Sequence, residues 1–100
     1  MYRIALICSL AVSCNTLKKA MLTEIQQKNI DCQIDCFQIE ACERIKDKYD
    51  IILLMPQVRY NLKKIQKTVS PTPVYVLDSK LFKNCDGRGT IEYILKICHL

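Results

Sequence analysis

The stretch RIALIC, residues 3–8, decides the fold of this 100-residue chain. After Arg3 it is a short and continuous apolar run, which is typical of a β-strand buried on both faces of a sheet. Two further apolar runs have the same character, DIILL at 50–54 and VYVL at 74–77. These three runs therefore predict buried strands of one sheet that is covered on both faces.

Helical patterns and one alternating segment separate these runs. Residues 31–38 alternate between polar and apolar and predict a more exposed strand, while 9–15 is expected to be a loop. Helical periodicity is expected from about Thr16 to Asn29 and at 40–49, 58–69 and 87–98. The order βαβαβαβα predicts an α/β fold. We expect an open four-stranded parallel sheet in the order 2-1-3-4, with helices on both faces and a flavodoxin-like or phosphatase-like topology.

Length, charge and cysteine usage narrow the class of protein. A chain of this size predicts a single domain over residues 1–100. The net charge of +5 suits an acidic or phosphorylated partner, but the basic residues are scattered, so nucleic-acid binding is not expected. Seven cysteines without a CxxC pair, and only one histidine, favour free thiols in a reducing, cytoplasmic setting, with no metal and no cofactor.

The amino-terminal apolar run also allows a different interpretation. Residues 11–14, AVSC, weakly resemble the cleavage box of a lipoprotein signal. The positive region before them is only Arg3, and the apolar core is short. We therefore expect a folded strand here, and no other run approaches the roughly 20 residues needed to span a bilayer.

Cys8 lies at a predicted position that favours a reactive thiol. Open α/β sheets bind ligands beyond the carboxyl ends of their strands, where the winding reverses, which places residues 8–15 beside 55–57. Backbone N–H groups before a helix can bind an anion and lower a thiol pKa. The expected phosphate-binding residues are Ser9, Leu10, Ala11, Val12, Ser13, Cys14 and Asn15. Residue type alone is equally consistent with Cys8 as an ordinary buried thiol.

Three motifs at the predicted strand ends resemble one family. They are Ile7-Cys8-Ser9 with Ser13, Leu54-Met55-Pro56-Gln57, and Val76-Leu77-Asp78-Ser79 followed by Leu81-Phe82 and Asp86-Gly87. In this order, over nearly the full length, they resemble the IIB component of the bacterial sugar phosphotransferase system, of the lactose, cellobiose and chitobiose type.

The resemblance implies a phosphoryl carrier. Cys8 would take phosphate from a phosphohistidine on a IIA protein and pass it to a sugar, expected to be a β-linked disaccharide, bound by a membrane IIC protein. Contact with the membrane would occur only through IIC. The expected rim of the site, or partner surface, is Pro56, Gln57, Tyr60 and Asp78. The chain departs from the family at Ala11, Met55 and Lys83, where glycine is usual, and at Cys14-Asn15, where Thr-Ser is usual.

Other functions stay open from sequence alone. A low-molecular-weight phosphatase would need an arginine six positions after Cys8, where this chain has Cys14. A non-catalytic regulatory module of the same fold is a further alternative. Cys14 also offers a disulfide with Cys8. Asp86 is expected to cap the last helix, and His99 to be solvated.

Overall fold

Four strands form one parallel sheet in the computed structural model, which describes residues 2–9 and 11–98, and the side chains of these except 11–13. Leu10 and His99 lie outside the described residues. The strands are β1 (Tyr2–Cys8), β2 (Cys32–Gln38), β3 (Ile51–Leu54) and β4 (Val74–Val76). Their order is β2-β1-β3-β4, which confirms the predicted order 2-1-3-4.

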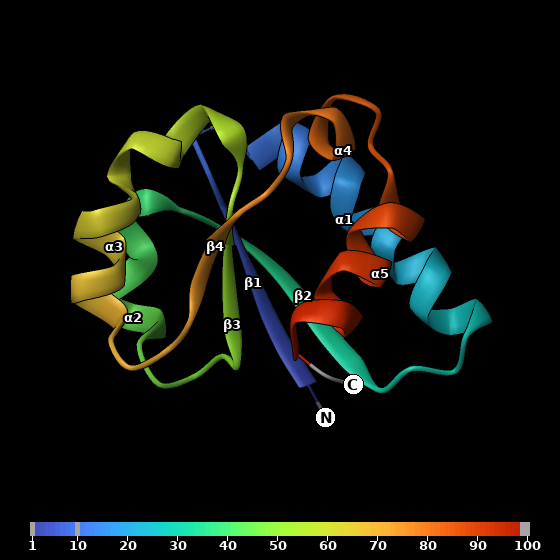
Figure 1. Ribbon diagram of the computed structural model, residues 1–100, viewed down its shortest axis with the longest axis horizontal. Helices are drawn as coiled ribbons and strands as arrows, with labels where there is room; N and C mark the ends of the chain where they lie inside the picture. The colour runs from blue at the N-terminus through green and yellow to red at the C-terminus, as the bar shows by residue number, and fades with distance from the viewer. Residues whose placement is uncertain (1, 10, 99–100) are drawn as a thin grey trace.

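Helices cover both faces of the sheet, as expected (Figure 1). On one face lie α1 (Ala11–Gln27), α4 (Ser79–Lys83) and α5 (Gly87–Cys98), and on the other lie α2 (Cys42–Ile45) and α3 (Leu62–Val69). Short 3-10 helices, η1 (Ile39–Ala41) and η2 (Pro56–Asn61), precede α2 and α3. No helix among the described residues is long and apolar enough to cross a membrane.

Strand β1 lies at the centre because it can be buried on both faces. Its residues 4–7 are fully buried and point alternately into two apolar clusters, one on each face. In register, Ile4 lies opposite Ile34 of β2 on one side and Ile51 of β3 on the other. This pairing brings the carboxyl ends of β1, β2 and β3 to the same edge of the sheet.

Helix α1 begins at Ala11, so the expected loop over 9–15 is wrong. The buried stripe of this helix, Leu17, Met21 and Ile25, extends one turn further back through Cys14, which is also fully buried. Cys14 behaves there as an apolar residue, because its thiol packs in the core. Its neighbours Ser13 and Asn15 are small and polar, so the sequence pattern did not indicate a buried helical position here.

The ends of two helices behave as the sequence predicts. Asn29, at a left-handed φ of 55°, follows α1, and the amide of Ile30 donates to the carbonyl of Ile25 at 2.9 Å. Asp86 caps α5 by accepting a hydrogen bond from the Gly89 amide at 2.8 Å. The expected helix over 40–49 is shorter, since α2 ends at Ile45. The expected helix over 58–69 becomes regular only at Leu62, because η2 contains a kink at Val58.

Candidate functional site

Cys8 lies where three strand ends meet. It is the last residue of β1 and pairs in register with Gln38, the last residue of β2. On the other side, the amide of Met55, directly after β3, donates to the carbonyl of Ile7 at 2.8 Å. The expected proximity of Cys8 and Met55 is therefore present, and the end of β2 is adjacent to Cys8 as well.

A pocket of about 320 Å³ opens beside Cys8. Its walls come from the end of β1, the β2–η1 junction and η2. The lining residues are Cys8, Ser9, Gln38, Ile39, Glu40, Val58, Tyr60 and Asn61. Three of them, Ile39, Glu40 and Asn61, also line a second pocket of about 310 Å³ that lies against α2 and α3. The two pockets therefore adjoin, so a molecule bound at Cys8 could extend from the first pocket into the second.

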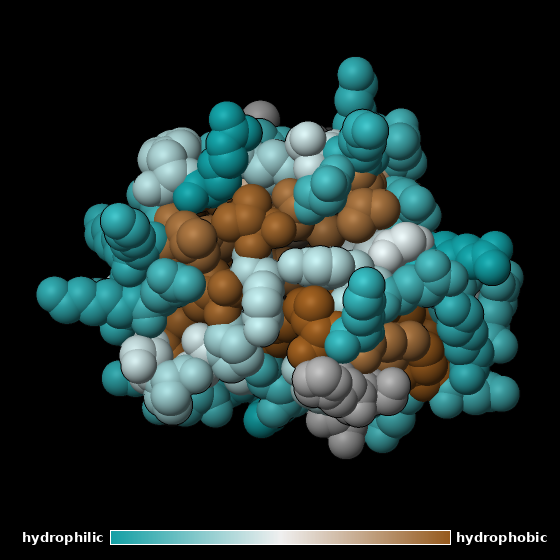
Figure 2. Space-filling view, viewed as in Figure 1, coloured by the Kyte–Doolittle hydropathy of each residue, from teal (hydrophilic) through white to brown (hydrophobic). Residues whose placement is uncertain are grey.

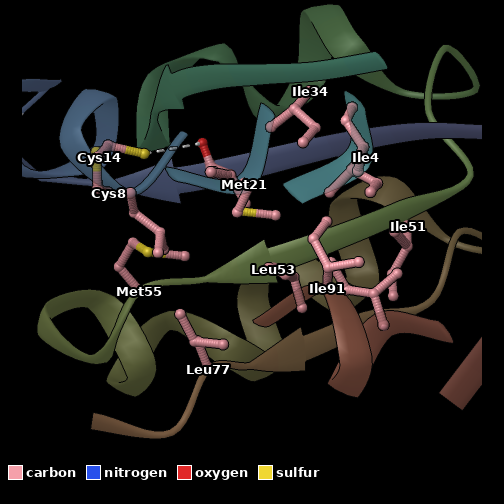
Figure 3. Close-up of a cluster of buried hydrophobic side chains, with 14 residues drawn as sticks. Ile4, Cys8, Cys14, Met21, Ile34, Ile51, Leu53, Met55, Leu77 and Ile91 are labelled. Atoms are coloured by element: carbon pink, nitrogen blue, oxygen red, sulfur yellow. Dashed lines mark hydrogen bonds between the residues drawn. The ribbon is translucent and has the colours of Figure 1, made fainter. Parts of the chain in front are cut away.

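The thiol of Cys8 is shielded from bulk water. The residue is 1% exposed, and its Sγ is directed toward the carbonyl oxygen of Phe37 at 4.0 Å. Cys8 belongs to the apolar cluster under α1, where Cys14 lies beside it (Figure 3). Burial of this kind limits access to groups that enter through the pocket.

The amino terminus of α1 follows Cys8 after only two residues. The first N–H groups of a helix have no acceptor within the helix, and the helix dipole makes this end attractive to anions. The first turn, residues 11–14, contains no acidic side chain that would compete for these donors. Because α1 begins at Ala11, Asn15 lies in the second turn, where amides bond to the carbonyl four residues back. The donors available to an anion are thus those at the very start of the helix.

Two further thiols are associated with the apolar cluster of Cys8, since Cys14 belongs to it and Cys36 packs against it. The Cys14 thiol is directed toward the Leu6 carbonyl at 3.8 Å, and the thiols of Cys36 and Cys8 are near enough for both to raise its pKa. The hydrogen bond with Cys36, and then burial, raise the pKa of Cys14 far above its ordinary value. The pKa of Cys36 is lowered, first by the hydrogen bond with Cys14 and also by the charge of Lys18.

The four residues predicted at the rim of the site differ in their positions relative to the pocket. Tyr60 lines the pocket and is 80% exposed. Pro56 begins η2 and Gln57 is exposed beside it, but neither lines the pocket. The Asp78 carboxylate accepts a hydrogen bond from the Lys80 amide at 2.7 Å and so caps α4. A role for Pro56, Gln57 and Asp78 in partner binding stays a prediction.

The sequence reasoning missed the wall contributed by β2 and η1. Gln38 and Glu40 line the pocket because β2 ends level with β1, a consequence of strand register. The order 2-1-3-4 already made β2 a neighbour of β1, so the residues after β2 could have been included. Asn61 was missed because the segment was expected to be regular helix from 58 onward.

Comparisons with known proteins identify the family and the fold. The family model for the lactose/cellobiose-specific IIB subunit of the PTS system matches residues 3–92. The fold is similar to the lactose-specific IIB component domain of the phosphoenolpyruvate:carbohydrate phosphotransferase system from Streptococcus pneumoniae. Identity is 15% and the TM-score 0.80, over 95% of each chain. It is also similar to the cellobiose-specific phosphotransferase IIB component from Borrelia burgdorferi. Here identity is 22% and the TM-score 0.75, over 91% of this chain and 85% of that one.

Proposed function

Because the chain belongs to the family of lactose/cellobiose-specific IIB subunits of the phosphotransferase system, we propose that Cys8 is the residue that carries the phosphoryl group. The observation that supports this most directly is the position of Cys8. It is the last residue of a central strand, it lines a pocket, and a helix begins three residues later. No other cysteine of the described residues combines a strand end, a pocket and a helix start.

The chemistry proposed at Cys8 is a simple displacement. The thiolate attacks the phosphorus of a phosphohistidine on a IIA protein, an S–P bond forms, and the P–N bond breaks. The released imidazole then takes up a proton. Such transfers depend mainly on in-line positioning and on donors for the phosphoryl oxygens. Ser9 and the first amides of α1, at Ala11, Val12 and Ser13, are the donors that we propose, with Leu10 between them.

The partner surface is proposed to surround the pocket. Tyr60 projects at its rim with 80% of its surface exposed, and a large exposed aromatic of this kind is typical of residues that contribute strongly to protein interfaces. The net charge of +5 favours a phosphorylated partner. We expect IIA to deliver the phosphoryl group at this surface in the cytoplasm, and a membrane IIC protein to present the sugar there afterwards.

The function is tested by labelling. Incubation with phosphoenolpyruvate, the general phosphotransferase proteins and a cognate IIA should add one phosphoryl group to the chain, mapped by mass spectrometry to Cys8. Cys8→Ser should accept no label. Cys42→Ser is a matched control, because Cys42 is similarly buried but lies in the apolar cluster on the other face of the sheet.

Two results would contradict the proposal. Label that persists in Cys8→Ser would place the carrier residue elsewhere, and an unlabelled wild type in the presence of active IIA would favour a non-catalytic module of the same fold. Circular dichroism of each variant shows whether a loss of label comes from a loss of structure.

A further inference from the structure

Three thiols from different parts of the chain gather beneath the start of α1. Cys14 of α1 points at the carbonyl of Leu6 in β1, at 3.8 Å, and Leu6 pairs in register with Cys36 of β2. Neighbouring strands lie about 4.8 Å apart, so a thiol over the Leu6 carbonyl is also close to the side chain of Cys36 on the same face. The packing agrees, since Cys36 contacts the apolar cluster that contains Cys8 and Cys14.

The two thiols of the Cys14–Cys36 pair differ in access and in acidity. Cys36 is half-buried on the edge strand, whereas Cys14 is fully buried. Lys18, one turn along α1 from Cys14, lies with its Nζ 4.0 Å from the Asp35 carboxylate, beside Cys36. The hydrogen bond with Cys14, and to a smaller extent the charge of Lys18, lower the pKa of Cys36. A thiol that is accessible and more acidic than usual is the kind that reacts first with oxidants.

We propose that Cys14 and Cys36 form a peroxide-sensitive dithiol that closes to a disulfide between α1 and β2. The Cys36 thiol releases its proton, the thiolate attacks hydrogen peroxide, and the O–O bond breaks. The products are Cys36 sulfenic acid and hydroxide, and the hydroxide takes up the released proton to become water. The sulfur of Cys14 then displaces the hydroxyl of the sulfenic acid, which leaves as water after taking the Cys14 proton. Two thiols and one peroxide thus yield one disulfide and two waters, and the sulfurs supply the two electrons.

Cys8 is the competing partner for Cys14. It is 1% exposed, so peroxide reaches it less readily than Cys36, and Cys36 raises the pKa of Cys14 more than Cys8 does. A disulfide between Cys14 and Cys36 would still fix the first turn of α1 beside Cys8. This consequence rests on the proposed function of Cys8: oxidation of Cys14 and Cys36 should lower phosphoryl acceptance without modifying Cys8.

The linkage can be mapped directly. The reduced full chain is treated with hydrogen peroxide, remaining thiols are alkylated, and the chain is digested with trypsin and Asp-N, which separates Cys32 from Cys36. Fragment spectra then distinguish Cys8 from Cys14 and Cys36 from Cys42. The expected product has lost two hydrogens and carries a Cys14–Cys36 bond that dithiothreitol reverses.

Single variants test which thiols are needed. Cys36→Ser should abolish the cross-link, whereas Cys32→Ser should form it as the wild type does. Cys32 is the matched control, because it lies four residues earlier on the same face of β2 and is also half-buried. A Cys8–Cys14 bond, or Cys36 oxidised to sulfinic acid without a cross-link, would overturn the proposal.

Phosphorylation of the oxidised chain separates this proposal from the proposed function. If Cys8 is the carrier, reduced protein accepts phosphate, and the unphosphorylated fraction should follow the disulfide fraction. A mapped Cys14–Cys36 bond in a chain that is never phosphorylated would support the dithiol and reject the carrier. Full phosphorylation of the cross-linked chain would support the carrier and reject its control by oxidation.

Discussion

Asp86 joins two helices within a very short span. Its amide donates to the Leu81 carbonyl at 2.9 Å, which closes the end of α4, and its carboxylate accepts from the Gly89 amide, which opens α5. Its carbonyl also accepts hydrogen bonds from the amide and the hydroxyl of the fully buried Thr90, at 3.0 and 2.8 Å. One exposed residue thus satisfies groups at the ends of both helices.

Loss of this cap should be measurable in the isolated chain. We expect Asp86→Ala to lower the free energy of unfolding by about 1 kcal/mol, because the Gly89 amide loses its acceptor at the helix start. Urea titration followed by circular dichroism measures the change. Asp86→Asn, which keeps a side-chain oxygen at the same place, should retain most of the stability, and an Ala variant as stable as the wild type would contradict the cap.

At the scale of elements, the packing of α5 against α1 depends on the absence of one side chain. A Cβ on Gly87 would meet the backbone of α1 at the carbonyl carbon of Ala20, with the Ala20 oxygen at 2.5 Å and the Met21 nitrogen at 2.6 Å. Backbone atoms inside a helix cannot turn aside as a side chain can. The first residue of α5 therefore sets how closely the two helices approach.

Gly87→Ala should separate α5 from α1 at this point. We expect a loss of about 1–3 kcal/mol in the free energy of unfolding, the usual range for overpacking a core. Gly89→Ala is the matched control in the same helical turn. Its Cβ would meet side-chain atoms, Asp86 Oδ2 at 2.6 Å and Leu81 Cδ2 at 2.7 Å, which can rotate away. Rotation of Asp86 would weaken its cap on the Gly89 amide, so the loss in this variant should not exceed about 1 kcal/mol. Equal urea midpoints for the two variants would show that α1 yields more easily than its backbone contact implies.

Elements whose burial is evident from their own residue pattern could be predicted from the sequence. Positions that depend on pairing between distant strands could not. Strands β1 and β3 were found because residues 4–7 and 51–54 are buried on both faces and carry continuous apolar runs. The start of α1 was missed because Cys14 can be read as polar or apolar, and only packing decides. Gln38 was missed in the pocket because its place depends on register with Cys8, which lies 30 positions earlier.

At the scale of the whole molecule, the apolar surface and the net charge act over different distances. Figure 2 shows hydrophobic side chains gathered along the middle of the face that β4 crosses, with hydrophilic side chains around its margin. Strand β4 forms an edge of the sheet and is only three residues long, and a short edge strand limits pairing with other chains. The net charge of +5 acts at longer range than either feature.

Phosphoryl transfer from an acidic or phosphorylated IIA should therefore slow as salt is added. The Debye length falls from about 10 Å at 0.1 M to about 3 Å at 1 M ionic strength, which screens the attraction that speeds encounter. Rapid-quench measurement of the second-order rate over this range tests the expectation. The free energy of unfolding at each salt concentration serves as the control, and a rate that does not change with salt would show that charge does not steer the encounter.

The central place of β1 has a consequence for how the chain is made. Synthesis produces the partners of Ile4 much later, Ile34 for one edge and Ile51 for the other. Until then an apolar strand has two open edges, and such strands are templates for aggregation. Cys8 gains its surroundings only when both partners and the segment through Asn61 have been translated. A nascent chain thus contains the Cys8 thiol early, whereas the pocket around it forms late.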